Sequence, residues 1–392
     1  MSPSPGAVRE LFRARFGGSA DGVWLAPGRA NLMGEHTDYN EGFVLPFALG
    51  QGIMAAAARR ADRRLVLCSA QSPDGVVSFV VDDLEPGRVS GWAAYPAGVA
   101  WALISAGYEV PGACLAFDSD VPAGAGLSSS AALECATALA LTELAGPELT
   151  GRSVDRRELA AIARRAENEF AGVPSGIMDQ SASLLSRSGH ALLLDCRSLE
   201  TSQVPFDPAG SGACLLLINT RARHELSAGQ YGQRRAECER AARLLGVPSL
   251  RYLTDVADVD RLSDSVLRRR ARHVVTDDRR VLDVVALLRS ASGDVYPEIG
   301  RLLTQAHASL RDDFEVSWPE ADVAVDAALA AGALGARMIG GGFGGSVLAL
   351  ARPQTAGPVR TAVAEAFAGR AWTAPEFLAA APSDSARRVG LE

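Results

Sequence analysis

The chain has 392 residues, of which 48% are hydrophobic and 22% charged, and its formal net charge is −7. This length exceeds what one hydrophobic core usually supports, so it predicts two domains. The acidic balance argues against a nucleic-acid-binding protein, and no apolar run of about 18 residues suggests a membrane span. The six cysteines are scattered without a CxxC pair, which is typical of reduced thiols in a cytoplasmic protein.

All 39 basic side chains are arginine, because the sequence contains no lysine. A Walker A loop, a protein-kinase site and a pyridoxal-phosphate site each require a lysine, so these three mechanisms are excluded. An aldolase that forms a lysine imine is excluded for the same reason. Negative charge on a transferring phosphoryl group would have to be met by arginine, Mg²⁺ or main-chain dipoles.

The first half of the chain mixes strand-like and helix-like patterns. Strands are predicted at residues 23–26, 43–49, 52–58, 65–69, 76–81 and 113–118, and helices at 93–106, 129–145 and 155–170. The pattern restarts after residue 185, with strands at 191–195 and 213–219 and helices at 228–245, 264–290, 297–313, 320–331 and 357–368. Residues 336–351, ARMIGGGFGGSVLALA, are expected to form a glycine-rich turn followed by a strand. These patterns predict two α+β domains, at 1–185 and 186–392.

Short arginine runs at 268–270 and 279–280 lie in one of the predicted helices, in a region rich in aspartate. A nucleic-acid-binding patch would also contain such runs. The acidic surroundings favour the interpretation that they form a solvated helix face.

Residues 26–40 read APGRANLMGEHTDYN, a polar stretch between apolar, strand-like segments. The stretch contains Arg29, Glu35, His36 and Asp38. Carboxylates accept hydrogen bonds from hydroxyl groups, so such a loop is typical of a site that grips a small polar molecule. A surface loop could hold the same residues without binding anything.

Residues 122–130 read PAGAGLSSS and stand between a predicted strand and a predicted helix. Gly124 and Gly126 allow the backbone to turn tightly and to approach a ligand closely. The three serines fall at the start of the helix, where free N–H groups and the helix dipole favour an anion. Ordinary helix capping needs only one hydroxyl, so three serines favour a polyphosphate, and a hydroxyl there can also bind Mg²⁺.

Residues 340–345 read GGGFGG, and five glycines in six positions are costly to order. Such a loop indicates close packing of the backbone against a neighbour, although a glycine-rich hairpin gives the same pattern. If the loop meets the two earlier motifs, the site lies in a cleft between the domains. Glu167 is a candidate carboxylate for Mg²⁺; alone, it would read as a surface residue of a helix.

Together the three motifs resemble those of the GHMP kinase superfamily, and GRANLMGEHTDYN resembles the signature of its galactokinase family. Similar segments extend from about residue 20 to residue 350, among them FAGVPSGIMDQ at 170–180 and YGQRRAECE at 231–239. The resemblance implies a ribosomal-protein-S5-like N-terminal domain and a ferredoxin-like C-terminal domain. It also implies an enzyme that uses ATP and Mg²⁺ to phosphorylate the anomeric hydroxyl of α-D-galactose, the first committed step of the Leloir pathway. We expect the protein to be cytoplasmic and monomeric.

The resemblance also implies roles for single residues. Asp179 faces the anomeric hydroxyl, as a general base or by orienting it, and Arg29 lies between Asp179 and the γ-phosphate. The galactose-binding positions are Glu35, His36, Asp38, Gly176, Asp179 and Tyr231. The ATP-binding positions are Ser69, Trp92, Gly124, Ala125, Gly126, Leu127, Ser128, Ser129 and Ser130. The magnesium positions are Ser130 and Glu167.

Three positions depart from the family pattern. Ile339 stands where threonine is common, which removes a hydroxyl near the nucleotide loop and bears on ATP affinity. Ala30 and Met33 replace bulkier or branched residues, a change expected to be neutral for packing.

Two alternatives remain. The first is a sugar sensor that binds galactose and ATP without turnover; the intact SSSAAL, Arg29 and Asp179 argue against it. The second is a kinase for arabinose, galacturonate, N-acetylgalactosamine or mevalonate, against which GEHTDY and Tyr231 favour galactose.

Overall fold

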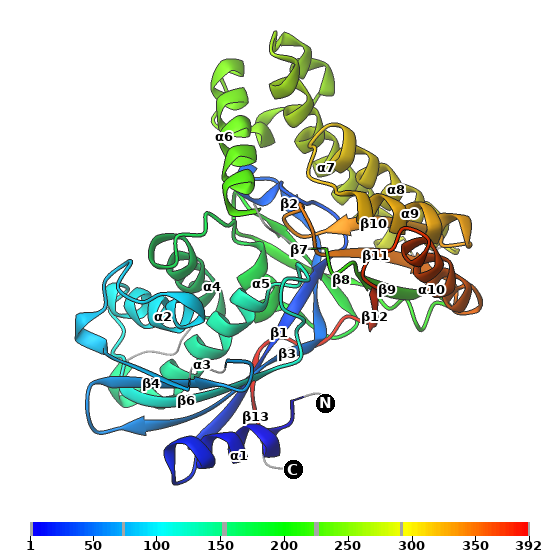
Figure 1. Ribbon diagram of the computed structural model, residues 1–392. Coiled ribbons are helices and arrows are strands. Elements are labelled where there is room, and N and C mark those ends of the chain that lie inside the picture. The colour runs from blue at the N-terminus through cyan, green and yellow to red at the C-terminus, as the bar shows by residue number, and fades with distance from the viewer. Residues whose placement is uncertain (1–2, 73–74, 151–154, 223–226, 291–292, 391–392) are drawn as a thin grey trace.

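The computed structural model describes residues 3–72, 75–150, 155–222, 227–290 and 293–390 (Figure 1). Its described elements are helices and strands in mixed order, which confirms the predicted α+β class. The strands form sheets of six, four and three members within these ranges. Both chain ends lie at the same end of the molecule, close to the six-stranded sheet.

The six-stranded sheet carries the first part of the chain. In spatial order its strands are β13 (Arg387–Val389), β1 (Gly22–Asn31), β3 (Pro46–Arg60), β6 (Gly112–Ser119), β4 (Arg64–Ser69) and β5 (Val76–Val80). Neighbouring strands are antiparallel except for β4 and β6, which are parallel.

Helices cover both faces of this sheet. They are α1 (Pro5–Phe16), α2 (Ala94–Ser105), α3 (Ser129–Thr150), α4 (Arg156–Arg165) and α5 (Met178–Leu185). Helix α1 packs against β3 and β6, while α3 packs against β1 and β3. Alternate residues of β3 enter different apolar clusters: Met54 packs near α1, and Ala55 joins the main core. Because both faces are covered, β3 is apolar along most of its length.

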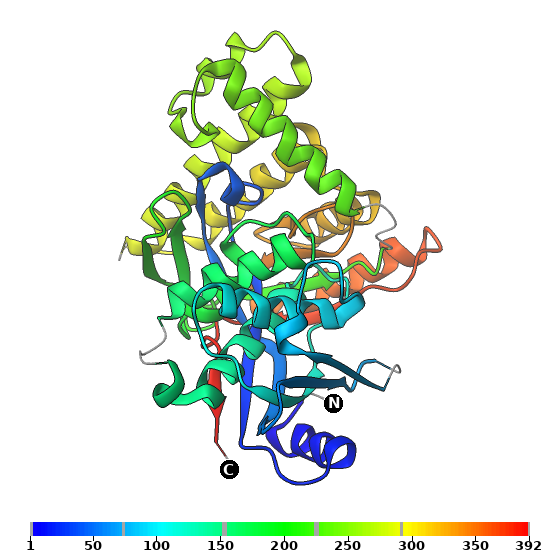
Figure 2. The ribbon, with the colours of Figure 1, turned by 90° about the vertical axis from the view of Figure 1, so that its left-hand side faces the viewer.

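The four-stranded sheet is antiparallel and belongs to the second half of the chain. Its strands, in spatial order, are β10 (Gly335–Ile339), β11 (Ser346–Ala351), β9 (Cys214–Asn219) and β12 (Glu376–Ala380). The helices around it are α8 (Tyr296–Asp312), α9 (Pro319–Ala330) and α10 (Pro353–Ala368). Helices α6 (Ser227–Leu245) and α7 (Ser265–Arg289) pack together and project from one end of the molecule (Figure 2).

The three-stranded sheet joins the two halves. It consists of β2 (Phe43–Val44), β7 (His190–Asp195) and β8 (Thr201–Pro205). Helix α7 contacts both β2 and β8, so the long helix of the second half packs directly beside the segment that follows the first motif. Within the described residues no helix combines the length and the hydrophobicity needed to cross a membrane.

The structure corrects several expected elements. The division into strands at 43–49 and 52–58 is wrong, because the chain forms the short β2 and then one continuous strand, β3. The helix expected at 155–170 is α-helical only to Arg165 and continues as a π-helix over Ala166–Phe170. Helices α1 and α5 and strands β8, β10, β12 and β13 were not predicted.

Two further expectations concern the second half of the chain. The solvated face expected for 268–270 is wrong for Arg270, because its side chain is 2% exposed and forms ion pairs with Glu237 and Glu315. The domain boundary near residue 185 stays a prediction. Strand β13, from the end of the chain, pairs with β1, so the two sequence halves share one sheet.

Candidate active site

A cleft of about 460 Å³ lies where the three sequence motifs meet. The predicted site residues among its lining are Arg29, Glu35, His36, Asp38, Gly124, Gly126, Leu127, Ser128, Ser129, Ser130, Glu167, Gly176, Asp179 and Tyr231. The lining also includes residues that were not predicted individually: Tyr95, Val173, Ser175, Met178, Gly340 and Gly341. The structure therefore brings together residues 26–40 (the sugar motif), residues 122–130 (the ATP loop) and residues 340–345 (the glycine-rich loop).

Three predicted residues lie outside this lining. Ser69 is the last residue of β4, and Ala125 is fully buried beneath its loop. Trp92 lies in a short 3₁₀-helix, where its ring meets Phe117 edge-on at 6.0 Å. The roles of these three residues in ATP binding stay predictions. The side chain of Ile339 is fully buried in the hydrophobic core, so the departure from threonine does not change the cleft surface.

A bidentate ion pair between Arg29 and Asp179 lines the cleft. Nε and Nη2 of Arg29 donate to Oδ1 and Oδ2 of Asp179 at 2.8 and 2.9 Å. Nη1 donates to the main-chain oxygen of Gly126 at 2.6 Å, and the Ser128 hydroxyl also donates to Asp179. Arg29 thus connects the candidate base to the glycine loop of the second motif.

The surroundings keep Arg29 charged. Burial by itself would lower the pKa of Arg29, but the nearby carboxylates of Asp179, Glu35 and Asp38 outweigh it and the pKa is raised. A guanidinium that is buried and held by two oxygens of one carboxylate has a fixed direction, which a lysine ammonium would not have.

Local backbone irregularity aims Arg29 into the cleft. The pairing of β1 with β3 shifts register between Pro27 and Arg29, and such bulges re-aim the side chains that follow. The Arg29 amide donates to the carbonyl of Leu127 at 3.1 Å, outside the regular sheet. At Gly28 a Cβ would lie 2.7 Å from that same carbonyl, so the close approach of β1 to the ATP loop requires glycine.

Two carboxylates of the first motif lie beside this ion pair. Burial raises the pKa of Glu35, although the cations Arg337 and Arg29 act against it. Burial and the Asp179 carboxylate raise the pKa of Asp38 to about 6. A Cβ at Gly176 would lie 1.7 Å from an oxygen of Asp38, so glycine at this position makes room for the carboxylate.

His36 is held in one tautomer by its two neighbours. Its Nε2 lies 3.2 Å from the main-chain oxygen of Gly341, and its Nδ1 lies 2.8 Å from the Tyr39 hydroxyl. Because a carbonyl can only accept, Nε2 carries the proton and Nδ1 accepts from Tyr39. Burial and the nearby His273 lower the pKa of His36 to about 3. The ring is therefore neutral, and both nitrogens are engaged within the protein.

The glycine-rich loop packs against the ATP loop. A Cβ at Gly340 would lie 3.0 Å from the carbonyl oxygen of Gly126, and φ at Gly340 is +83°. Ser128 also has a positive φ, at +57°, which costs a non-glycine residue about 1 kcal/mol. Helix α3 begins directly after it at Ser129, so the positive end of this helix faces the cleft.

Glu167 sits in the π-helix, and three side chains donate to its carboxylate. Ser130 donates to Oε1 at 2.9 Å, while Ser175 and Gln180 donate to Oε2 at 2.5 and 2.8 Å. Burial raises the pKa of Glu167, although these hydrogen bonds lower it. A π-helical turn often marks a functional residue. The Ser130 hydroxyl and the Glu167 carboxylate supply oxygen ligands of the kind that Mg²⁺ prefers.

Comparison with known proteins identifies the family. Residues 10–59 match the galactokinase galactose-binding signature, residues 94–187 the N-terminal domain of GHMP kinases and residues 286–369 their C-terminal domain. A galactokinase of Streptomyces coelicolor is 52% identical over 388 residues, which cover 98% of each chain. The chain belongs to the galactokinase family. A galactokinase of Mycobacterium tuberculosis is 45% identical over 327 residues, 83% of this chain and 87% of that one.

Solved structures show the same fold. The structure of Lactococcus lactis galactokinase complexed with galactose matches with a TM-score of 0.90 at 32% identity, covering 98% of this chain and 99% of that one. A mevalonate kinase of Methanococcus jannaschii matches with a TM-score of 0.66 at 15% identity over 94% of this chain, which shows the shared fold alone. The two-domain GHMP kinase fold predicted from the sequence, S5-like and then ferredoxin-like, is confirmed.

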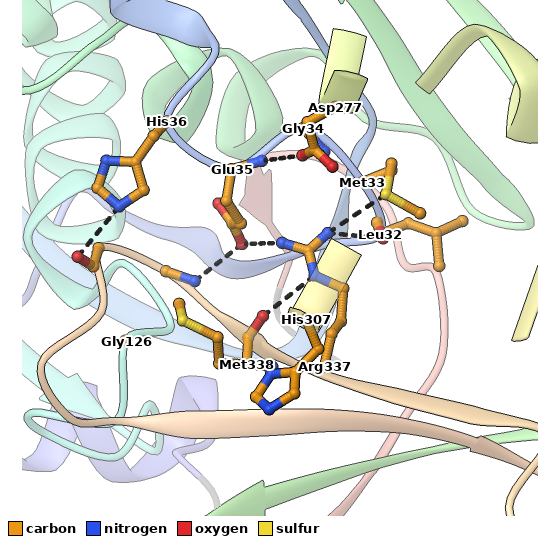
Figure 3. A network of polar contacts seen from close by, with 12 residues as sticks. Leu32, Met33, Gly34, Glu35, His36, Gly126, Asp277, His307, Arg337 and Met338 are labelled. Atoms are coloured by element: carbon orange, nitrogen blue, oxygen red, sulfur yellow. Dashed lines mark hydrogen bonds and ion pairs between the residues drawn. The ribbon is translucent and has the colours of Figure 1, made fainter. Parts of the chain in front are cut away.

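Several polar residues of this galactokinase-family site escaped prediction. Gln180 also donates to the fully buried Glu134 at 3.0 Å, which links α5 to α3. Asp277 of α7 accepts a hydrogen bond from the Glu35 amide, and Arg337 of β10 forms an ion pair with the Glu35 carboxylate (Figure 3). Arg337 and Asp277 lie far from Glu35 in sequence, so no local spacing linked them to it. The local signal was the presence of each charge in an otherwise apolar or helical segment.

The tautomer of His36 generates a prediction about pH. The folded state holds this ring neutral down to about pH 3, whereas an unfolded histidine takes up a proton near pH 6.5. The unfolded chain then binds more protons between these values, so this residue destabilises the fold as the pH falls from about 6.5 towards 3. ¹⁵N NMR of labelled histidine at pH 6 is expected to show a neutral Nε2–H ring. An imidazolium or an Nδ1–H tautomer for His36 would contradict the assignment.

Proposed function

We propose that this protein transfers the γ-phosphoryl group of ATP to the anomeric hydroxyl of α-D-galactose. The products are ADP and galactose 1-phosphate, and the reaction is the first committed step of galactose catabolism. The family membership supports both the activity and the substrate. The observation that carries the proposal in the structure is the position of the Arg29–Asp179 pair, between the carboxylates of the sugar motif and the serines of the ATP loop.

Asp179 is the group proposed to act on the sugar hydroxyl. Arg29 and Ser128 donate to its oxygens and hold them in one orientation. The carboxylate then accepts the hydrogen bond of the anomeric O–H, and it takes the proton as the oxygen attacks phosphorus, or after it. Since phosphoryl transfer passes through a loose transition state, orientation of the hydroxyl contributes alongside proton removal.

Arg29 and the ATP loop are proposed to meet the developing charge. The guanidinium is buried and already oriented, so it needs little rearrangement as negative charge builds on the phosphoryl oxygens. The start of α3 adds the positive end of a helix dipole on the same side. No lysine is present to share this work.

Glu35, Asp38 and Tyr231 are proposed to recognise galactose, with Gly176 shaping the pocket beside Asp38. A carboxylate that is buried and aimed at one hydroxyl selects strongly, because a sugar without that hydroxyl leaves the carboxylate unpaired. His36 supports this pocket. Its nitrogens bind Tyr39 and Gly341, so it fixes the position of the two loops relative to each other.

Mg²⁺ is the proposed cofactor, with Ser130 and Glu167 as its protein ligands. Both side chains line the cleft and their oxygens lie 2.9 Å apart, which fits a small cation that prefers oxygen. When bound with ATP, the ion would neutralise part of the phosphate charge. Ser175 and Gln180 hold the Glu167 carboxylate from the other side, so its direction does not depend on the ion.

A sugar panel tests the function, with Asp179→Asn as the diagnostic variant. Purified protein with ATP and Mg²⁺ is expected to release ADP with galactose, and much more slowly with arabinose, galacturonate, N-acetylgalactosamine or mevalonate. The Asp179→Asn variant is expected to lose at least about 10²-fold in kcat, the scale of one preorganised charged group, while it still binds galactose. A thermal melt shows whether the variant remains folded.

Two results would contradict this account. If the wild-type protein shows no turnover with galactose, the proposed function is wrong. If folded Asp179→Asn turns over galactose at nearly the native rate, the role of Asp179 is wrong even though the function stands.

The magnesium proposal is tested with Glu167→Gln. Glutamine preserves the size of the side chain but removes the charge, so the Mg²⁺ concentration for half-maximal activity is expected to rise about tenfold or more. Glu169→Gln is the matched control, because Glu169 lies in the same π-helical turn but is exposed and pairs with Arg165 at the surface. A magnesium titration that is unchanged in Glu167→Gln, relative to Glu169→Gln, would remove Glu167 from the metal site.

A further inference from the structure

Arg337 is a completely buried arginine in an apolar strand. It belongs to β10, directly before the glycine-rich loop, and its side chain is 0% exposed. Its Nη1 donates to the main-chain oxygen of Leu32 at 3.0 Å, and its Nε donates to that of Met338 at 3.1 Å (Figure 3). Nη2 lies 3.1 Å from Oε1 of Glu35, as an ion pair whose angle is too bent for a hydrogen bond. The guanidinium is therefore fixed by two carbonyls and lies in ion-pair contact with one carboxylate oxygen.

The amide, the carbonyl and one carboxylate oxygen of Glu35 each contact another part of the protein. Its amide donates to Oδ2 of Asp277 at 3.2 Å, and its carbonyl accepts from Nε2 of His273 at 3.0 Å. Oε1 accepts from the amide of Gly340 at 2.8 Å and meets Arg337 at 3.1 Å. The four partners named here come from the second half of the chain, and the Asn31 side chain of the first half also acts on the carboxylate, lowering the pKa that burial raises. The second carboxylate oxygen, Oε2, takes no part in the four contacts, and Glu35 lines the cleft.

We infer that Arg337 is a positioning residue for sugar binding: it holds Oε1 of Glu35 so that Oε2 is presented to a hydroxyl of the substrate. The inference rests on the proposed function, since it needs a polyhydroxylated substrate in the cleft. Nothing in the proposal requires Arg337 to touch the substrate. It acts through Glu35, together with the amide of Gly340.

A planar arginine guanidinium suits this position better than the point charge of a lysine ammonium would. A buried carboxylate without a partner is expensive, and burial already raises the pKa of Glu35 against the pull of Arg337. Lysine could supply the charge. It could not hold two carbonyls and a carboxylate oxygen in three directions, which the planar guanidinium does. Without the Arg337 guanidinium, the Glu35 side chain gains rotamers in which Oε2 takes the contacts of Oε1 and Oε1 takes the position of Oε2.

A purely stabilising role for Arg337 makes different predictions from a positioning role. If Arg337 only stabilises the packing of β10, its loss lowers the melting temperature and affects both substrates and kcat alike. If it positions Glu35, its loss weakens galactose binding selectively, and this effect disappears when Glu35 itself has lost its charge. The second pattern arises only if Arg337 and Glu35 are energetically coupled.

The test is a double-mutant cycle on the KM for galactose, with wild type, Arg337→Met, Glu35→Gln and the double variant. Arg337→Met is expected to raise the galactose KM about tenfold or more, the scale of the coupling between two charged groups in contact. The KM for ATP and kcat are expected to change by less than about threefold. In the Glu35→Gln background, Arg337→Met is expected to add less than about threefold, because the carboxylate that it positions is already neutral.

Two further variants keep the result interpretable. Arg337→Lys is expected to restore stability but only part of the galactose affinity, since it returns the charge without the planar guanidinium. Arg270→Met is the matched control: Arg270 is also a buried arginine, 2% exposed, that binds two carboxylates and a carbonyl, but none of these partners lines the cleft. It is expected to lower the melting temperature without a selective change in the galactose KM.

The outcomes separate the inference from the function on which it rests. If wild type does not use galactose, the proposed function fails first. If wild type uses galactose and Arg337→Met changes kcat and both KM values together, as a general loss of stability would, the positioning role is overturned. Should Arg337→Met not fold, the comparison of Arg337→Lys with wild type and of the double variant with Glu35→Gln decides by the same criteria, because the double variant buries no unpaired carboxylate.

Discussion

The bidentate ion pair between Arg29 and Asp179 is the interaction on which the arrangement of the cleft depends. It joins β1 to α5, and through Gly126 and Ser128 it also ties both to the ATP loop. Removing one partner of such a buried pair leaves an uncompensated charge and typically costs about 3–5 kcal/mol. The pair is therefore structural and chemical at once. The carboxylate proposed to face the sugar is oriented by the cation proposed to face the phosphate.

The cleft concentrates negative charge, and its cations are few and immobile. Asp38, Asp179 and Glu35 lie near one another, and this proximity, after burial, raises the pKa of Asp38 to about 6. Arg29 forms an ion pair with Asp179, and Arg337 forms one with Glu35. Each guanidinium is buried and planar, so its orientation as well as its charge is set by the protein. The absence of lysine from the sequence is compatible with this chemistry, because the site depends on geometry that lysine does not provide.

Contiguous motifs explain how much of the site was predictable. The loop containing Arg29 and the loop containing the three serines each combine polar side chains suited to a ligand with glycines that the local backbone requires. Composition and spacing therefore reveal both loops in a single sequence. Arg337 could not be predicted in this way, since it is one charged residue in the apolar strand GARMI and contacts a carbonyl 305 positions away. The π-helical turn at Glu167 and the return of β13 to the first sheet also depend on tertiary packing. Arg270 was misread because a helical charge run usually faces water, whereas here one member turns inward.

The central claim is that the cleft around the Arg29–Asp179 pair directs the phosphoryl group of ATP to the anomeric hydroxyl of galactose. The most direct measurement is an NMR spectrum of the product formed from ATP and uniformly ¹³C-labelled galactose. The account predicts that phosphorus splits the C1 resonance of the sugar, because the new P–O bond is to the anomeric oxygen. Splitting at C6 or at any other carbon that bears a free hydroxyl, without the coupling to C1, would contradict it.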